Sequence, residues 1–204
     1  MGSFAYSGQV CISVQRIFVH EDVFDKFTDL FKQETEKLVT GDPLDPTTTF
    51  SAMIDEENAI RVEDWVNSAV KSGAKLIVGG KRDNLIYPPT VLTNVPATER
   101  VVCEEVFGPV VVIEKFVDFT DAVNRVEDSD FGLQAGVFTK DISKILEAFD
   151  KINVGGVMIN DVPTFRVDQM PYGGNKDSGF GREGLKYSME KYTSIKLLMI
   201  NENS

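Results

Sequence analysis

Cys11 is the first residue in the chain whose type and setting could do chemistry, in the segment Gly8-Gln9-Val10-Cys11. A thiolate is a strong nucleophile, and a helix N-terminus or a nearby cation favours that form of the side chain. The turn that Gly8 and Gln9 predict could deliver the thiol to a helix start, where backbone N–H groups could stabilise an oxyanion. A small buried packing residue is the commoner role of a free cysteine, so local sequence leaves both interpretations open.

A cysteine–histidine hydrolase would need an imidazole beside that thiol. His20 is the only histidine, and it lies nine positions after Cys11, across a predicted strand. An exposed histidine at the end of a strand is the simpler interpretation. Thiol-esterase chemistry at Cys11 remains an alternative, which acyl-enzyme formation with an activated ester would reveal.

Carboxylates and an aromatic ring stand together in the segment from Cys103 to Pro109, just before a predicted buried strand. A carboxylate such as Glu105 could accept two hydrogen bonds from a ribose diol, and Phe107 could cover a planar ring. A solvated acidic turn with Phe107 in the core is the alternative. Cys103 has no distinguishing neighbour and is interpreted as a packing residue.

The segment 171–184 is rich in glycine, which predicts positive φ angles or close approaches of the backbone. The order Gly-Lys-Ser/Thr of a phosphate-binding P-loop is absent from it. No strand precedes it, so its Gly-x-Gly-x-x-Gly-like string does not qualify as a dinucleotide fingerprint either.

Strand-like and helix-like segments alternate along the chain around these residues. We predict strands at 16–19, 76–78, 110–117, 134–138 and 154–159, and helices at 22–39, 55–72, 118–129, 141–151 and 183–191. This alternation predicts an α/β fold, with three layers (α/β/α) and a mostly parallel central sheet. The apolar segment 193–200 predicts a further strand in the tail.

The composition is that of a folded domain, with 42% hydrophobic and 26% charged residues. A formal net charge of −11 argues against binding to nucleic acid or to an anionic membrane surface. The two cysteines are too few for a disulfide scaffold, and no secretory leader or membrane-spanning run is evident, so we expect reduced thiols and a cytoplasmic location. We assign no metal ligands.

Taken together, the motifs resemble the aldehyde dehydrogenase superfamily. The matching strings follow in family order: GQVC, EEVFGPV, FGLQAGVFTKD, VGGVMIN and PYGGNKDSGFGREG. The resemblance extends from Gly8 to the tail. It implies NAD- or NADP-dependent oxidation of an aldehyde to a carboxylic acid, through a cysteine thiohemiacetal and a thioester.

The resemblance also implies roles for individual positions around the cofactor. Cys11 matches the catalytic nucleophile. Glu105 matches the residue that holds the ribose on the nicotinamide side, Phe107 is a neighbour of the cofactor, and Leu133 lies near the nicotinamide. These roles come from the family and not from the spacing of the residues.

Three further positions match the substrate side of the family's site. Tyr172 matches an aromatic residue that lines the aldehyde channel, and Asn160 a position near the substrate loop. Arg166 lies in the loop expected at the channel mouth, where a guanidinium would favour an aldehyde that carries a carboxylate, sulfonate or phosphonate. A surface pair of Arg166 with Asp168, or with another carboxylate of the loop, is the alternative.

The family places a dinucleotide-binding half, a glutamate general base and an oxyanion-hole asparagine before the nucleophile, and this sequence contains no such segment. We therefore expect residues 1–3 to be a vector remnant and residues 4–192 to be the catalytic (C-terminal) domain of a longer enzyme. Alone, it should be inactive and bind NAD+ poorly. Residues 193–204 are expected to form a tail strand of the oligomerisation type, and hence a homo-oligomer. A non-catalytic interaction domain of the same fold is the alternative.

Overall fold

The computed structural model describes residues 2–202, so residue 1 of the expected vector remnant and residues 203–204 of the expected tail lie outside it. Its largest sheet has four strands in the order β1–β4–β3–β2: β1 (Arg16–His20), β4 (Val110–Phe116), β3 (Thr90–Thr93) and β2 (Lys75–Val78). β1 and β3 both pair with β4 in parallel, and β2 pairs with β3 antiparallel at the edge. The predicted α/β fold with a mostly parallel sheet is confirmed.

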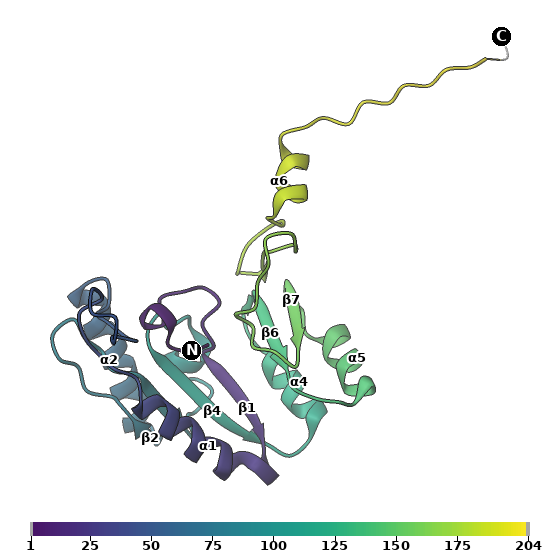
Figure 1. The fold of residues 1–204 in the computed structure, drawn as a ribbon. Helices are drawn as coiled ribbons and strands as arrows, with labels where there is room; N and C mark the ends of the chain where they lie inside the picture. Colours follow the sequence, from purple (N-terminus) through teal and green to yellow (C-terminus); the bar gives the residue numbers. More distant parts are fainter. Residues whose placement is uncertain (1, 203–204) are drawn as a thin grey trace.

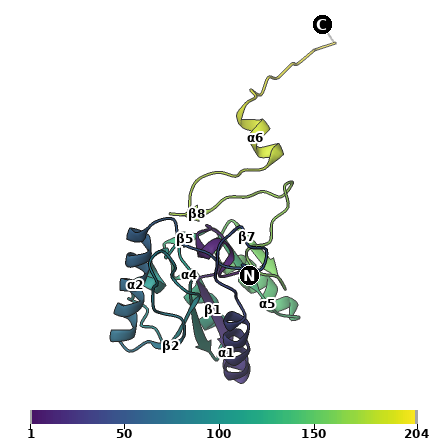
Figure 2. The same ribbon diagram turned by 60° about the vertical axis from the view of Figure 1, so that its left-hand side comes forward.

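Helices cover this sheet on both faces (Figures 1 and 2). α1 (Glu21–Glu36) packs on one face, and α2 (Glu56–Lys71) with the short α3 (Arg100–Cys103) packs on the other. The side chains of β4 alternate accordingly. Val110 and Val112 belong to the core under α2, whereas Val111 and Ile113 belong to the core under α1. A run of apolar residues without polar alternation is typical of a strand buried on both faces.

Side chains with local hydrogen bonds start the two long helices. Asp55, at the predicted start of the helix, is the N-cap of α2 and accepts from the backbone N–H of Asn58 at 2.8 Å. His20 caps α1, which begins one residue before its predicted start at 22, and its Nδ1 accepts from the Asp22 backbone N–H at 3.3 Å. The only histidine is therefore occupied at the end of β1, which agrees with the simpler interpretation of His20.

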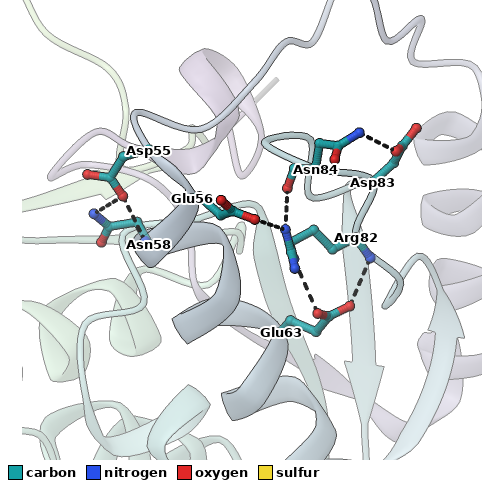
Figure 3. Close-up of polar contacts among 7 residues, drawn as sticks. All are labelled: Asp55, Glu56, Asn58, Glu63, Arg82, Asp83 and Asn84. Carbon is teal, nitrogen blue, oxygen red and sulfur yellow. Dashed lines mark hydrogen bonds and ion pairs between the residues drawn. The ribbon is translucent and has the colours of Figure 1, made fainter.

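An ion-pair network ties the loop after β2 to α2 (Figure 3). The guanidinium of Arg82 contacts carboxylate oxygens of Glu56 and Glu63, each at 3.3 Å. The backbone N–H of Arg82 also donates to Glu63 at 3.0 Å. These contacts fasten the edge of the sheet to the helix that covers it.

A second, smaller sheet carries the remaining motifs. β6 (Gln134–Val137) and β7 (Gly156–Ile159) pair in parallel, and α4 (Phe119–Glu127) and α5 (Ile142–Lys151) pack against them around a separate small core. β5 (Phe131–Gly132) pairs antiparallel with β8 (Asn175–Lys176). The central sheet is therefore divided into separate sheets, where the sequence predicted one.

The strand β3 was missed by sequence reasoning, although it lies in the middle of the sheet. All its residues are buried, and Val91 and Leu92 are inaccessible to solvent. Prolines at 88, 89 and 96 flank this four-residue strand, and prolines normally mark turns and strand ends.

The predicted tail strand 193–200 is not formed in the single chain, so a strand that pairs with a second copy stays a prediction. The chain runs away from the body of the molecule beyond α6 (Leu185–Lys191), as Figure 1 shows. Ile195 and the apolar run 197–200 are largely exposed. A strand needs a neighbouring strand to satisfy its backbone hydrogen bonds, and no described edge lies beside this segment. No described helix has the length and apolar character of a membrane span.

Candidate active site

Cys11 lies in an exposed turn between a short 3-10 helix, η1 (Ala5–Gly8), and β1. Its exposure excludes the role of a buried packing residue. The predicted helix start behind Gly8 is not found, because left-handed φ angles at Tyr6, Ser7 and Gly8 (51°, 58° and 69°) turn the chain directly towards β1. The sulfur therefore does not face a helix N-terminus from this segment.

The structure brings Tyr172 to this sulfur. Tyr172 Oη lies 2.9 Å from Cys11 Sγ, although the two residues are 161 positions apart in the sequence. The backbone of Tyr172 is held on both sides by Glu183, with its N–H donating to the Glu183 carbonyl at 3.0 Å and its carbonyl accepting at 2.6 Å. Burial and the hydrogen bond with Cys11 raise the pKa of Tyr172 to about 12, so the hydroxyl is protonated at neutral pH.

Arg166 covers the ring of Tyr172. Its guanidinium carbon lies 4.3 Å from the ring centroid, which is a cation–π contact. No ion pair joins Arg166 to Asp168 in the described part of the chain. Both residues instead line an open crevice of about 720 Å³ with Glu183 and residues of α6. Cys11, Tyr172 and Arg166 thus form one continuous cluster.

The Glu105–Phe107 segment is packed against the Cys11 turn through two glycines. A Cβ atom added to Gly8 would lie 2.1 Å from the carbonyl oxygen of Gly108, so only a glycine fits there. Phe107 has a φ of 44° and its side chain is 44% exposed. Glu105 is also exposed. The alternative that placed Phe107 in the core is therefore wrong, and both side chains are accessible to a ligand.

Gln15 is a site residue that sequence reasoning missed. Its Nε2 donates to the carbonyl oxygens of Glu104 at 2.7 Å and Val101 at 3.0 Å, and its Oε1 accepts from the N–H of Val106 at 2.9 Å. One amide side chain thereby fastens the acidic segment to the strand that follows Cys11. No local signal distinguishes Gln15, since Ser13 and Arg16 beside it are polar too.

Leu133 is half-buried between β5 and β6, and its carbonyl accepts from the Gly155 N–H at 2.9 Å. Gly155 lies directly against Gly173, since a Cβ added to Gly155 would come within 1.6 Å of the Gly173 oxygen. This backbone contact connects the Leu133 segment to the residue after Tyr172.

Asn160 ends β7 with a φ of 57°, and its Oδ1 accepts from the Thr139 N–H at 2.9 Å. The described hydrogen bonds of Asn160 hold the turn after β6 and do not reach the Cys11 sulfur. Cys103 is exposed at the end of α3, so its interpretation as a packing residue is wrong. In residues 2–202, no three or more histidines, cysteines or carboxylates are grouped to hold a metal ion.

Comparison with known proteins places this arrangement in context. Residues 1–198 match the model of the aldehyde dehydrogenase family. The chain is 48% identical over 199 residues to 3-sulfolactaldehyde dehydrogenase of Priestia aryabhattai, covering 98% of this chain and 42% of that protein.

Solved structures give the same result. Aldehyde dehydrogenase 21 of Physcomitrella patens, in complex with the reaction product succinate, superposes with a TM-score of 0.96 at 44% identity, over 100% of this chain and 42% of that one. Glyceraldehyde-3-phosphate dehydrogenase GapN of Methanocaldococcus jannaschii, complexed with NADP, gives a TM-score of 0.91 at 42% identity, over 96% and 42% of the two chains. This chain therefore spans about 42% of the length of these relatives. Its sequence motifs, its fold and these similarities show that the chain belongs to the aldehyde dehydrogenase family.

Proposed function

We propose that this chain carries the catalytic cysteine and part of the substrate channel of an NAD(P)-dependent aldehyde dehydrogenase. The observation that carries the proposal is the position of Cys11: its exposed sulfur contacts Tyr172, and its turn packs against the segment that presents Glu105 and Phe107. Nucleophile, channel aromatic and cofactor contacts would then meet at one place, as oxidation of a bound aldehyde requires.

In the proposed reaction, the Cys11 thiolate attacks the aldehyde carbonyl and forms a thiohemiacetal. The backbone N–H of Cys11 has no hydrogen-bond acceptor in the described part of the chain, so it is available to the oxyanion that forms. The oxidation of the thiohemiacetal would be supplied by bound NAD(P)+ as hydride acceptor. The thioester that remains on Cys11 is released as carboxylic acid by water. This chain offers no residue that we assign as the general base.

The residues present fit one part of the cofactor. The exposed Glu105 carboxylate would accept hydrogen bonds from the ribose hydroxyls, and the exposed Phe107 ring would lie beside the nicotinamide, with Leu133 nearby. Gln15 and the contact between Gly8 and Gly108 hold this segment beside Cys11. Contacts around one ribose do not replace a whole dinucleotide cleft, so we expect the 204-residue chain alone to bind NAD(P) weakly and to be inactive.

We further propose an aldehyde that carries an anionic group, with Arg166 as its partner. Arg166 lies on an open crevice beside Tyr172, and its guanidinium has the fork geometry that suits sulfonate, carboxylate or phosphate. The compounds named for the three relatives above, 3-sulfolactaldehyde, succinate and glyceraldehyde 3-phosphate, all carry such a group, whereas Methanococcus relatives at 41–44% identity are named for lactaldehyde, which carries none. Asn160 lies at the start of the loop that carries Arg166 and would also be near the substrate.

The exposed tail is proposed to pair with a second copy of the protein. Ile195 and residues 197–200 present apolar side chains that a partner strand or surface would cover. A cytoplasmic location is consistent with the two free, exposed cysteines.

Replacing the nucleophile in the complete enzyme tests the reaction. Cys11→Ser should lower NAD(P)H formation from an aldehyde by about a thousandfold or more, because a serine hydroxyl is a poor nucleophile without a base. Cys103→Ser is the matched control and should retain activity, because Cys103 is exposed outside the cluster. Retention of activity by Cys11→Ser would refute the assignment of the nucleophile.

A further inference from the structure

The sulfur of Cys11 has an unusual environment for a reactive thiol. Thiolates in proteins are commonly favoured by a helix N-terminus or by a neighbouring cation. The turn that carries Cys11 provides no helix start, and no Lys, Arg or His in residues 2–202 contacts the sulfur. The polar contact that the structure does give is the Tyr172 hydroxyl at 2.9 Å.

We propose that the Tyr172 hydroxyl is a positioning residue for the nucleophile: it holds the Cys11 side chain and donates a hydrogen bond to its thiolate. A tyrosine hydroxyl can accept from a thiol and, by rotating its hydrogen, donate to a thiolate. The proposal rests on the proposed function only in taking Cys11 as the nucleophile. It adds a role for the oxygen of Tyr172, whereas a channel lining needs only the ring.

Three contacts fix the direction of this hydroxyl. Reciprocal backbone hydrogen bonds with Glu183 hold the main chain of Tyr172, and Gly155 packs against the adjoining Gly173. Arg166 covers the ring at 4.3 Å. With backbone and ring both held, the oxygen stays directed at Cys11. The pKa of Tyr172, raised to about 12 by burial and by its contact with Cys11, keeps the proton available for donation at neutral pH.

The arrangement also couples Arg166 to the nucleophile. Arg166 does not touch the sulfur, but its cation lies over the ring whose oxygen does. A cation over the ring makes the hydroxyl a better donor, since it withdraws electron density electrostatically. Removing the charge of Arg166 should therefore lower the thiolate fraction of Cys11 at neutral pH. Removing the Tyr172 hydroxyl should lower this fraction too, and by more.

Alkylation of Cys11 by iodoacetamide tests the proposal without aldehyde or NAD(P). The 204-residue chain would be used with Cys103→Ser throughout, so that Cys11 is the only thiol. Second-order rates would be measured from about pH 5.5 to about pH 10 for the parent, Tyr172→Phe and Arg166→Met, because the rate follows the thiolate fraction. Tyr192→Phe is the matched control, since Tyr192 is 91% exposed at the C-terminal end of α6 and makes no described contact with the sulfur.

Tyr172→Phe should slow alkylation at neutral pH about three- to tenfold, the effect of one partly solvated hydrogen bond to a charged group. Its rate should rejoin that of the parent at high pH, where every thiol is ionised. Arg166→Met should give a smaller shift in the same direction, and Tyr192→Phe none.

Superimposable profiles for Tyr172→Phe and the parent would overturn the proposal, and so would faster alkylation of Tyr172→Phe at neutral pH. A larger effect of Arg166→Met than of Tyr172→Phe would also overturn it, because the cation would then act on the sulfur by another route. Circular dichroism checks that each variant is folded. Failure of the proposed function would appear separately, as retained dehydrogenase activity in Cys11→Ser.

Discussion

Gly8→Ala tests whether direct backbone contact places the nucleophile. Gly8 has a φ of 69°, and a Cβ there would lie 2.1 Å from the Gly108 oxygen and 2.4 Å from its carbonyl carbon. The turn next to it also contributes Phe4, which is 5% exposed, to the core under α1. An alanine at position 8 must therefore displace either the turn or the Gly108–Pro109 backbone.

Two effects set the magnitude. The left-handed conformation costs an alanine about 1–2 kcal/mol relative to glycine. Forcing an extra methyl group into a filled space costs about 1–3 kcal/mol more, because backbone cannot swing aside as a side chain can. We expect Gly8→Ala to lower the free energy of unfolding by about 2–5 kcal/mol.

Gly73→Ala is the matched control. Gly73 has a φ of 106°, but a Cβ there meets nothing within 4 Å, so this variant carries the conformational cost without the clash. Urea unfolding followed by the fluorescence of Trp65, the only tryptophan and 5% exposed, would compare the two variants. Gly8→Ala should be the less stable by about 1–3 kcal/mol. Equal losses of stability in the two variants would show that the contact of Gly8 with Gly108 is not tight.

Three further predictions concern side chains around the site. Gln15→Leu removes three hydrogen bonds and should weaken NAD(P) binding by the complete enzyme severalfold; an unchanged Kd would contradict the role of Gln15. Arg166→Ala in the complete enzyme should raise KM about tenfold or more for anionic aldehydes but little for neutral ones, and equal effects would remove the anion hypothesis. Burial opposes the ionisation of Glu127, but its pairing with Lys176 at 2.7 Å and a hydrogen bond from the Asn153 N–H at 2.7 Å outweigh burial and lower the pKa of Glu127. The stability from this pair is therefore present above the ordinary carboxyl pKa of about 4.3 and is lost as the pH falls through the lowered value. Lys176→Met should reduce this loss of stability at acid pH, as measured by unfolding titrations at several pH values.

The parts of the fold that could be predicted are those where local pattern and tertiary role agree. β4 is an apolar run buried on both faces, and α2 begins at a capping aspartate, so both were evident in the sequence. β3 was hidden because its neighbouring prolines suggest a loop. The tail strand stays a prediction, because an apolar run does not reveal whether a pairing edge is present.

The candidate site was predictable in its residue types but not in its contacts. Family resemblance singled out Cys11 and Tyr172, yet no local signal shows that a hydroxyl would reach a sulfur 161 positions away. The helix start expected at Cys11 is absent because three successive left-handed residues, 6–8, direct the chain elsewhere. Gln15 acts through backbone groups of another segment, and such partners carry no side-chain signature in the sequence.

The separation of Cys11 and Tyr172 in the chain has a consequence for biosynthesis. A ribosome delivers the tyrosine 161 residues after the cysteine, so the thiol is synthesised before its partner exists. Closing so long a loop is entropically costly, and the contact forms only once the intervening sheets have brought its ends together. The contact between Cys11 and Tyr172 therefore depends on the sheets that lie between them in the chain, and the reactivity of the thiol would report on that assembly.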